Sequence, residues 1–457
     1  MSLYIRGSTL GRLANEASLT ESTADIARPS STPSLIRAIG RWALTAAVIN
    51  GVIGSGVFGL PSALAGFAGA WSPLTVLIAG VGIFMIVLCF AEVGSRFDQA
   101  GGPYLYTREA FGPAVGFQIG WLHIWTRLIS CAAVLNVLSG YLTPLVPWTG
   151  TSVGRATIMI FVMVLVTSIN VAGVRQAAWT VNAFTIAKLL PLAFVIVLGL
   201  FQFDGAVVAT QTVAQPKWTE AVLLLVFGYG GFESAVVAGS ESKDPKRDTA
   251  FALIAAMLAV TVIYCLVQLA VVGVLPNAAT SKAPVAATLG VLVGPVGLTL
   301  GSIAVIISVY GWLTGFSLMS PRIFYSMAER HELPQVLARV HPTTRTPYVA
   351  IIVNSTIGLG LGLASNFGQL ATFGAISRLG IYIATCAALI ALRRKHGEPT
   401  GFRAPGGIVL AVSGIVFCLW LLSTRSLAQA WFLPLVILLG FGVWGVMRAA
   451  RASAVRQ

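Results

Sequence analysis

The chain has 457 residues, of which 56% are hydrophobic and only 10% are charged. A soluble globular domain carries about 25% charged residues, so the composition excludes a soluble protein and indicates one polytopic membrane domain. A net charge of +14 would suit a nucleic-acid partner, but the positions of the charges argue against one, as described below.

About twelve apolar segments are long enough to cross roughly 30 Å of hydrocarbon. They are expected at 41–67, 73–95, 113–143, 155–173, 180–203, 217–239, 250–275, 288–325, 347–364, 367–392, 406–423 and 428–448. The third and eighth exceed a straight crossing and are expected to tilt or to extend past the bilayer. Residues 1–35 are rich in Ser, Thr and Arg, which predicts a disordered tail rather than a cleavable signal peptide.

Lysine and arginine are distributed unevenly between the alternating loops. Of 29 such residues, the loops on one side hold only Arg155, Lys217, Lys282 and Arg425, and the apolar segments hold Arg127, Lys188 and Arg378. The remainder lie on the side of both chain ends. By the positive-inside rule, this asymmetry predicts that both termini are cytoplasmic. The charge therefore reports topology, and we expect no nucleic-acid partner.

The first apolar segment contains a glycine-rich stretch, with Gly54, Gly56 and Gly59 followed by Pro61. Three glycines weaken a helix interior, and Pro61 suits the first turn of a resumed helix. We predict a helix that breaks near mid-membrane, where the freed backbone groups could hold a polar solute. The alternative is a glycine-rich face that packs against a neighbouring helix.

The sixth segment repeats this pattern in Phe227–Ser234, where three glycines precede the carboxylic acid Glu233. The two broken helices stand five crossings apart, and an odd repeat inverts the second copy relative to the first. Interrupted helices in corresponding positions of two halves indicate the central site of a transporter. The alternative is a chance placement among 48 glycines.

Longer motifs extend the pattern over nearly the whole chain after the tail. They are Ile53–Phe58, Phe90–Phe97, Ala100–Tyr104, Arg108–Pro113, Phe232–Ser234, Glu241–Asp248, Met327–Arg330 with Leu333–Pro334, and Thr346–Pro347. Together they resemble the amino acid–polyamine–organocation superfamily of permeases, specifically bacterial amino acid transporters. His331–Glu332 departs from the family pattern, because a small turn pair is more usual there.

This resemblance implies an all-α integral membrane protein with twelve helices in an inverted five-plus-five repeat. We expect a tail at 1–35, a transport core of helices 1–10 at 36–395, and helices 11–12 with a short cytoplasmic end at 396–457. The substrate of the family lies between helices 1, 3, 6, 8 and 10.

The resemblance also implies that the substrate is an α-amino acid held by backbone groups. The amides of Ser55, Gly56 and Val57 would bind the α-carboxylate, as a helix N-terminus favours an anion. The carbonyls expected to accept the α-ammonium are those of Val52, Ile53, Phe227, Gly228 and Gly230. The Phe227 side chain is assigned as a lid over the substrate, with ordinary aromatic packing as the alternative.

Two charged residues inside the membrane are expected to act in coupling or gating. Lys188 lies deep in the fifth segment, and a buried ammonium is a functional candidate by default. In sodium-independent relatives a lysine at the matching place fills the room of a sodium ion and bonds to the broken first helix, so no sodium dependence is expected. Glu233 either holds the broken helix or carries a coupling proton. Glu92 lies nearer the cytoplasmic end, as a gate or as a partner of basic groups.

Arg127 in the third segment shares a helical face with Cys131, and in relatives that face looks onto the substrate side chain. Arg127 would then disfavour cationic substrates, whereas the alternative is that it pairs with Glu233 or another group away from the pocket. Trp312 is a candidate pocket wall or a core residue. The sequence does not determine which way the Arg378 side chain points.

These observations predict a secondary active transporter of α-amino acids in the plasma membrane, with proton symport favoured over amino acid exchange. The expected partners are the amino acid, a proton and the lipid bilayer. No catalytic residues, cofactor or metal site are expected, because the five cysteines all lie in apolar segments and no nucleophile–base set stands out. A channel or receptor is the alternative of another class.

Overall fold

The computed structural model describes residues 40–97, 102–173, 178–233, 242, 244–399, 401–425 and 431–455. The predicted tail at 1–35 lies outside these residues. Residues 38–457 form one compact unit. The regular elements of the described residues are all helices, which confirms the predicted all-α class.

Most of the expected crossings are single helices. They are α4 (Ser72–Gly94), α6 (Pro113–Leu142), α7 (Ser152–Val171), α8 (Ala178–Phe201), α12 (Pro245–Val274), α16 (Tyr348–Ala364), α17 (Phe367–His396), α18 (Gly407–Ser423) and α20 (Phe432–Val455). Short helices α5 (Gly102–Phe111) and α9 (Gly205–Thr210) lie in connections. In the described chain, seven helical segments are long and apolar enough to cross a membrane, and shorter apolar helices accompany them.

The first crossing is broken, as predicted. Helix α2 (Arg41–Val52) ends before Ile53 and Gly54, and α3 (Ser55–Ala68) begins directly afterwards. The prediction for Pro61 was wrong, because the helix resumes at Ser55 and Pro61 lies inside α3. The N-terminal residues of α3 supply first-turn amides that have no acceptor in the preceding turn.

The sixth crossing is also broken. Helix α10 (Trp218–Gly228) ends at the predicted glycines, and Tyr229, Gly230 and Gly231 form turns before Phe232 and Glu233 return to helix. Gly231 has φ of +122°, a conformation that side chains rarely adopt. The remainder of the predicted segment lies beyond the residues that can be described.

The eighth segment differs from the expected single long crossing. It comprises three helices, α13 (Pro284–Val293), α14 (Pro295–Met319) and α15 (Pro321–Glu329). Gly294 has φ of +79°, and each following helix starts with proline at N1. Because proline lacks an N–H group and fits the first helical turn, it starts a new helix at both junctions.

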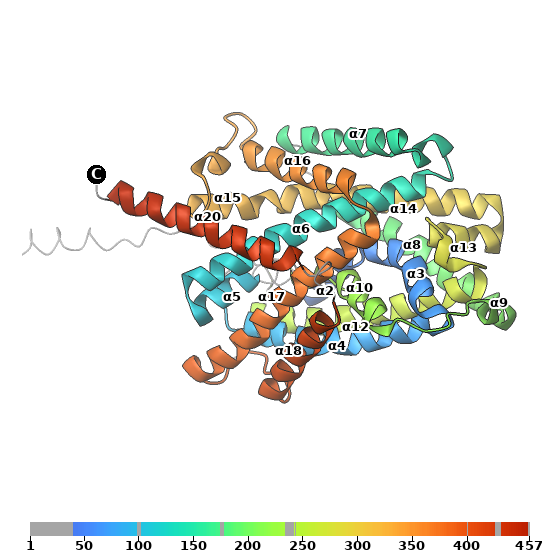
Figure 1. The fold of residues 1–457 in the computed structure, drawn as a ribbon, viewed down its shortest axis with the longest axis horizontal. Helices are drawn as coiled ribbons and strands as arrows, with labels where there is room; N and C mark the ends of the chain where they lie inside the picture. The colour runs from blue at the N-terminus through green and yellow to red at the C-terminus, as the bar shows by residue number, and fades with distance from the viewer. Residues whose placement is uncertain are drawn as a thin grey trace, which may run out of the picture. The chain divides into compact units, whose positions relative to one another are not determined.

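The helix contacts follow the predicted inverted repeat, in which each helix has its counterpart five crossings later. Helix α6 packs against α17 and α16, and its counterpart α14 packs against α8 and α7. In the same way, the contact of α2 with α12 is matched by that of α10 with α4. The two broken helices meet through α3 and α10, next to α6 and α17 (Figure 1).

Candidate functional site

The two helix breaks are packed backbone against backbone. A methyl group added to Gly56 would lie 2.7 Å from the Cα of Gly228, and one added to Gly231 would collide with the carbonyl oxygen of Gly51. Any side chain at these positions would push the two breaks apart. Glycine is therefore needed here for close approach as well as for backbone freedom.

The start of α3 has the properties of an anion site. Its N-cap is Gly54, and no side chain of the described residues caps it. The first-turn residues Ser55, Gly56 and Val57 are all buried. Uncapped amides at a buried helix N-terminus, together with the helix dipole, favour a carboxylate. That the start of α3 binds the carboxylate of a substrate stays a prediction.

A tyrosine hydroxyl joins the carbonyl ends of both broken helices, a contact that the sequence did not predict. Tyr264 on α12 places its hydroxyl 3.1 Å from the Val52 oxygen and 3.0 Å from the Gly228 oxygen. The Val52 oxygen also accepts the Gly54 amide at 2.8 Å. A carbonyl has two lone pairs, so an ammonium group binding at Val52 would have to displace or share one of these donors.

Lys188 is 2% exposed and bonds to the end of α2. Its ammonium donates to the backbone oxygen of Asn50 at 2.9 Å and to the Asn50 side-chain oxygen at 2.7 Å. A buried ammonium needs such acceptors. Asn50 was not singled out, although a polar side chain next to a predicted break was a visible signal.

Glu233 holds the second break together. Its carboxylate accepts the Gly231 amide at 2.6 Å and the Tyr382 hydroxyl at 2.7 Å. It also lies 3.5 Å from the Nε of Arg378. These contacts suit the structural alternative for Glu233, and they leave proton coupling as a prediction.

Arg378 on α17 lies directly at the second break. A methyl group on Gly230 would overlap its guanidinium, and its Cζ lies 5.2 Å from the centre of the Phe227 ring. Its Nη2 donates to the hydroxyl of Ser130 on α6 at 3.1 Å. Phe227 itself is buried and packs edge-to-face with Phe367 at 6.1 Å. The Arg378 side chain thus points toward the second break.

Arg127 stacks on two aromatic rings of α14. Its Cζ lies 5.6 Å from the ring centre of Trp312 and 5.4 Å from that of Phe316. The Trp312 ring covers Gly54, where an added methyl group would lie 3.2 Å from the indole nitrogen. Trp312 therefore lies beside the first break, and Arg127 lies over its ring; the role of Trp312 as a pocket wall stays a prediction.

Cys131 points elsewhere. Its sulfur would lie 3.2 Å from a methyl group added to Gly358 of α16, whereas the neighbouring Ser130 contacts α17. The face predicted for Arg127 and Cys131 is divided between two partner helices, because Arg127 contacts α14 and Cys131 contacts α16. The predicted substrate contact of Cys131 remains a prediction.

The cavity described beside the junction of the breaks is small. A cavity beside Gly56, Tyr264 and Gln268 has a volume of about 10 Å³. Such a volume is at the lower limit for a single water molecule. An amino acid could occupy this part of the junction only if the helices separated, which fits a site with alternating access.

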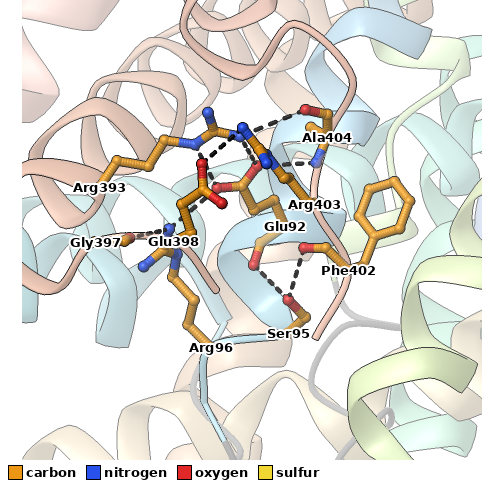
Figure 2. Close-up of polar contacts among 9 residues, drawn as sticks. All are labelled: Glu92, Ser95, Arg96, Arg393, Gly397, Glu398, Phe402, Arg403 and Ala404. Atoms are coloured by element: carbon orange, nitrogen blue, oxygen red, sulfur yellow. Dashed lines mark hydrogen bonds and ion pairs between the residues drawn. The ribbon is translucent and has the colours of Figure 1, made fainter. Parts of the chain in front are cut away.

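A second buried ionic cluster lies at the end of α4 (Figure 2). Glu92 accepts two hydrogen bonds from Arg393, at 2.7 and 2.6 Å, one from Arg96 at 3.1 Å and one from the Ala404 amide at 2.9 Å. This set joins α4 to α17 and to the chain that follows α17. It agrees with the interpretation of Glu92 as a partner of basic groups.

A helical bundle of membrane-spanning segments, with two broken helices in contact at its centre, defines a membrane transport protein. Within that class, the chain belongs to the amino acid permease family, whose family model matches residues 39–444. The match covers all the helices that form the two breaks.

Three relatives align over most of the chain. It is 29% identical to the serine/threonine exchanger SteT of Bacillus subtilis (strain 168), over 89% of this chain and 95% of SteT. It is 27% identical to the branched-chain amino acid permease BcaP of the same organism, over 87% and 90%. It is 28% identical to an arginine/agmatine antiporter of Chlamydia pneumoniae, over 88% of each chain. Because their named substrates have different side chains, similarity alone does not fix the side chain that this protein accepts.

Proposed function

We propose that the protein is a secondary carrier that moves α-amino acids across the bacterial plasma membrane by alternating access. The contact between the two breaks is the main support. It brings the uncapped amides at Ser55 close to the carbonyl ends at Val52 and Gly228. An α-amino acid carries a carboxylate and an ammonium group on one carbon atom. The amides of α3 could bind the carboxylate, and the carbonyls could bind the ammonium group.

We further propose that transport does not depend on sodium. The Lys188 ammonium contacts the first broken helix through Asn50, and a fixed cation at that place would repel a sodium ion. Both chain ends would be cytoplasmic, as the positive-inside rule predicts.

Uptake of radiolabelled amino acids by purified protein in liposomes tests the proposal. We expect uptake with sodium replaced by choline, and loss of uptake in Lys188→Ala. Countertransport driven by preloaded substrate would identify a carrier, whereas its absence alongside downhill flux would indicate a channel. Normal sodium-independent uptake by Lys188→Ala would remove the assignment of Lys188.

Proton symport is the coupling we favour, with Glu233 as the candidate proton carrier. Amino acid exchange is the second candidate, because two of the relatives are named as an exchanger and an antiporter. An imposed pH gradient separates the two. A symporter accumulates substrate in empty liposomes when the outside is acidic, whereas an obligate exchanger requires substrate inside.

A further inference from the structure

Arg378 is a buried arginine whose hydrogen-bonding capacity is largely unused. Only 4% of it is exposed. A guanidinium has five N–H donors, and the hydrogen bond to Ser130 uses one of them. Within the part of the chain that the structure describes, Nε and Nη1 have no hydrogen-bond partner. Buried donors without acceptors are costly, which indicates that a ligand supplies the missing acceptors.

The neighbouring acid does not satisfy these donors. Glu233 Oε1 lies 3.5 Å from Nε, an ion-pair distance without a hydrogen bond. Both carboxylate oxygens of Glu233 already accept shorter bonds, from Gly231 and Tyr382. Glu233 thus balances the charge of Arg378 in part while remaining committed to the second helix break.

The position of Arg378 places these donors at the proposed substrate site. Its guanidinium lies against Gly230 in the break and over the ring of Phe227. The α-carboxylate of a substrate would be taken by the amides that start α3, on the other broken helix. Donors contributed by α17 at the second break would therefore face a different group of the same substrate.

The charge around this position favours an anionic group. Arg378 carries a permanent positive charge, and the carboxylate of Glu233 already accepts hydrogen bonds from the Gly231 amide and the Tyr382 hydroxyl. A substrate with a second carboxylate would pair with the unused donors of Arg378, and arginine–carboxylate hydrogen bonds are among the strongest in proteins.

We propose that Arg378 binds a side-chain carboxylate, so that the substrates are acidic α-amino acids. This inference rests on the proposed function. Arg378 then determines specificity, with Ser130 and Phe227 positioning its guanidinium. An amide of the same shape has one acceptor oxygen and would turn its NH2 group toward the other guanidinium donor, so it would bind more weakly.

Matched pairs of ligands test this inference in a binding assay with full-length protein in detergent. L-Glutamate is compared with L-glutamine, and L-aspartate with L-asparagine, because each amide keeps the shape but lacks the charge. We expect at least one acid to bind about tenfold or more tightly than its amide, the range expected for a hydrogen bond to a charged group. Equal binding of acids and amides would overturn the inference.

Variants of Arg378 add a second, independent readout. Arg378→Gln should abolish the preference for the acid while changing amide affinity by less than about threefold, and Arg378→Lys should keep part of the preference. Equal weakening of acid and amide by Arg378→Gln would mean that the residue is only structural. If Arg378→Gln does not fold, the wild-type ligand pairs and Arg378→Lys decide.

Arg155→Gln is the matched control, because Arg155, like Arg378, donates to a side chain of α6, at the Asn136 oxygen, and the proposed site does not use it. The acid-to-amide ratio of this variant should equal that of the wild type. If no amino acid of any kind binds or is transported, the proposed function itself is wrong and this inference falls with it. Transport of neutral amino acids without recognition of acids would overturn only the inference.

Discussion

Glu92 and Glu233 are both buried beside arginines, and the two sites differ in how completely they are hydrogen-bonded. At the end of α4, Glu92 accepts four hydrogen bonds, two of them from Arg393 (Figure 2). At the second break, Arg378 makes one hydrogen bond within the described part of the chain and lies 3.5 Å from Glu233. A carboxylate with four donors has no lone pair left for a ligand. The contacts of Glu92 therefore hold helices together. Arg378, in contrast, has unused donors at the place where a solute is proposed to bind.

The largest effect is expected for Glu92→Gln. This change leaves the partly buried Arg393 and Arg96 without their carboxylate, and breaking a buried pair costs about 3–5 kcal/mol. The apparent melting temperature in detergent and the yield of monodisperse protein should both fall, with or without substrate. A variant as stable as the wild type would contradict the role of Glu92 in holding the helices together.

The next largest effect is expected for Gly56→Ala, which tests the close packing of the two breaks. The new methyl group would lie 2.7 Å from the Cα of Gly228, and overpacking of this kind costs about 1–3 kcal/mol. Substrate binding should be lost together with some stability.

Gly315→Ala on α14 is the control for that change, because no neighbouring element among the described residues lies within 4 Å of the position that its methyl group would take. It should keep both binding and stability. Full transport activity in Gly56→Ala would show that the breaks are not packed as described.

A smaller effect is expected for Tyr264→Phe, which removes the hydroxyl that contacts the carbonyls of Val52 and Gly228. Loss of one such hydrogen bond costs about 0.5–1.5 kcal/mol, and substrate affinity should fall by up to about tenfold. Tyr229→Phe is the matched control, since its hydroxyl donates to the Val76 oxygen at 3.1 Å, on α4. We expect the two variants to have similar stability and only Tyr264→Phe to change substrate affinity. Equal affinities in the two variants would contradict this prediction.

The smallest effect is expected for Arg403→Ala, within the same group of residues as Glu92 (Figure 2). Arg403 lies 2.6 Å from Glu398, but the two side chains are 59% and 62% exposed. An exposed pair contributes about 0–1 kcal/mol, so the melting temperature should barely change. A loss as large as that of Glu92→Gln would show that burial does not separate the two kinds of pair.

The fold could be predicted from the sequence wherever the residues that determine a feature lie in one short stretch. The glycines at 54–56 and 228–231 predicted both helix breaks, because glycine weakens a helix wherever it falls. The three-way division of the eighth segment was missed. Gly294, Pro295 and Pro321 were signals for it, but an unbroken apolar composition outweighed them.

The site was predictable only in part, because its contacts join residues far apart in the chain. The depth of Lys188 in an apolar segment marked it as functional, but its partner Asn50 lies 138 positions away. The bond between Arg378 and Ser130 spans 248 positions, and Tyr264 gave no signal within its apolar run. Helical periodicity placed Cys131 beside Arg127, but it could not show that Cys131 faces α16.

The central claim is that main-chain groups at two broken helices hold both charges of an α-amino acid. Competition against radiolabelled uptake in liposomes tests it most directly, with a transported amino acid compared with its methyl ester and with the amine that lacks its carboxylate. The account predicts that the free amino acid inhibits uptake and that the ester and the amine do not. Equal inhibition by the ester and the free amino acid would contradict it.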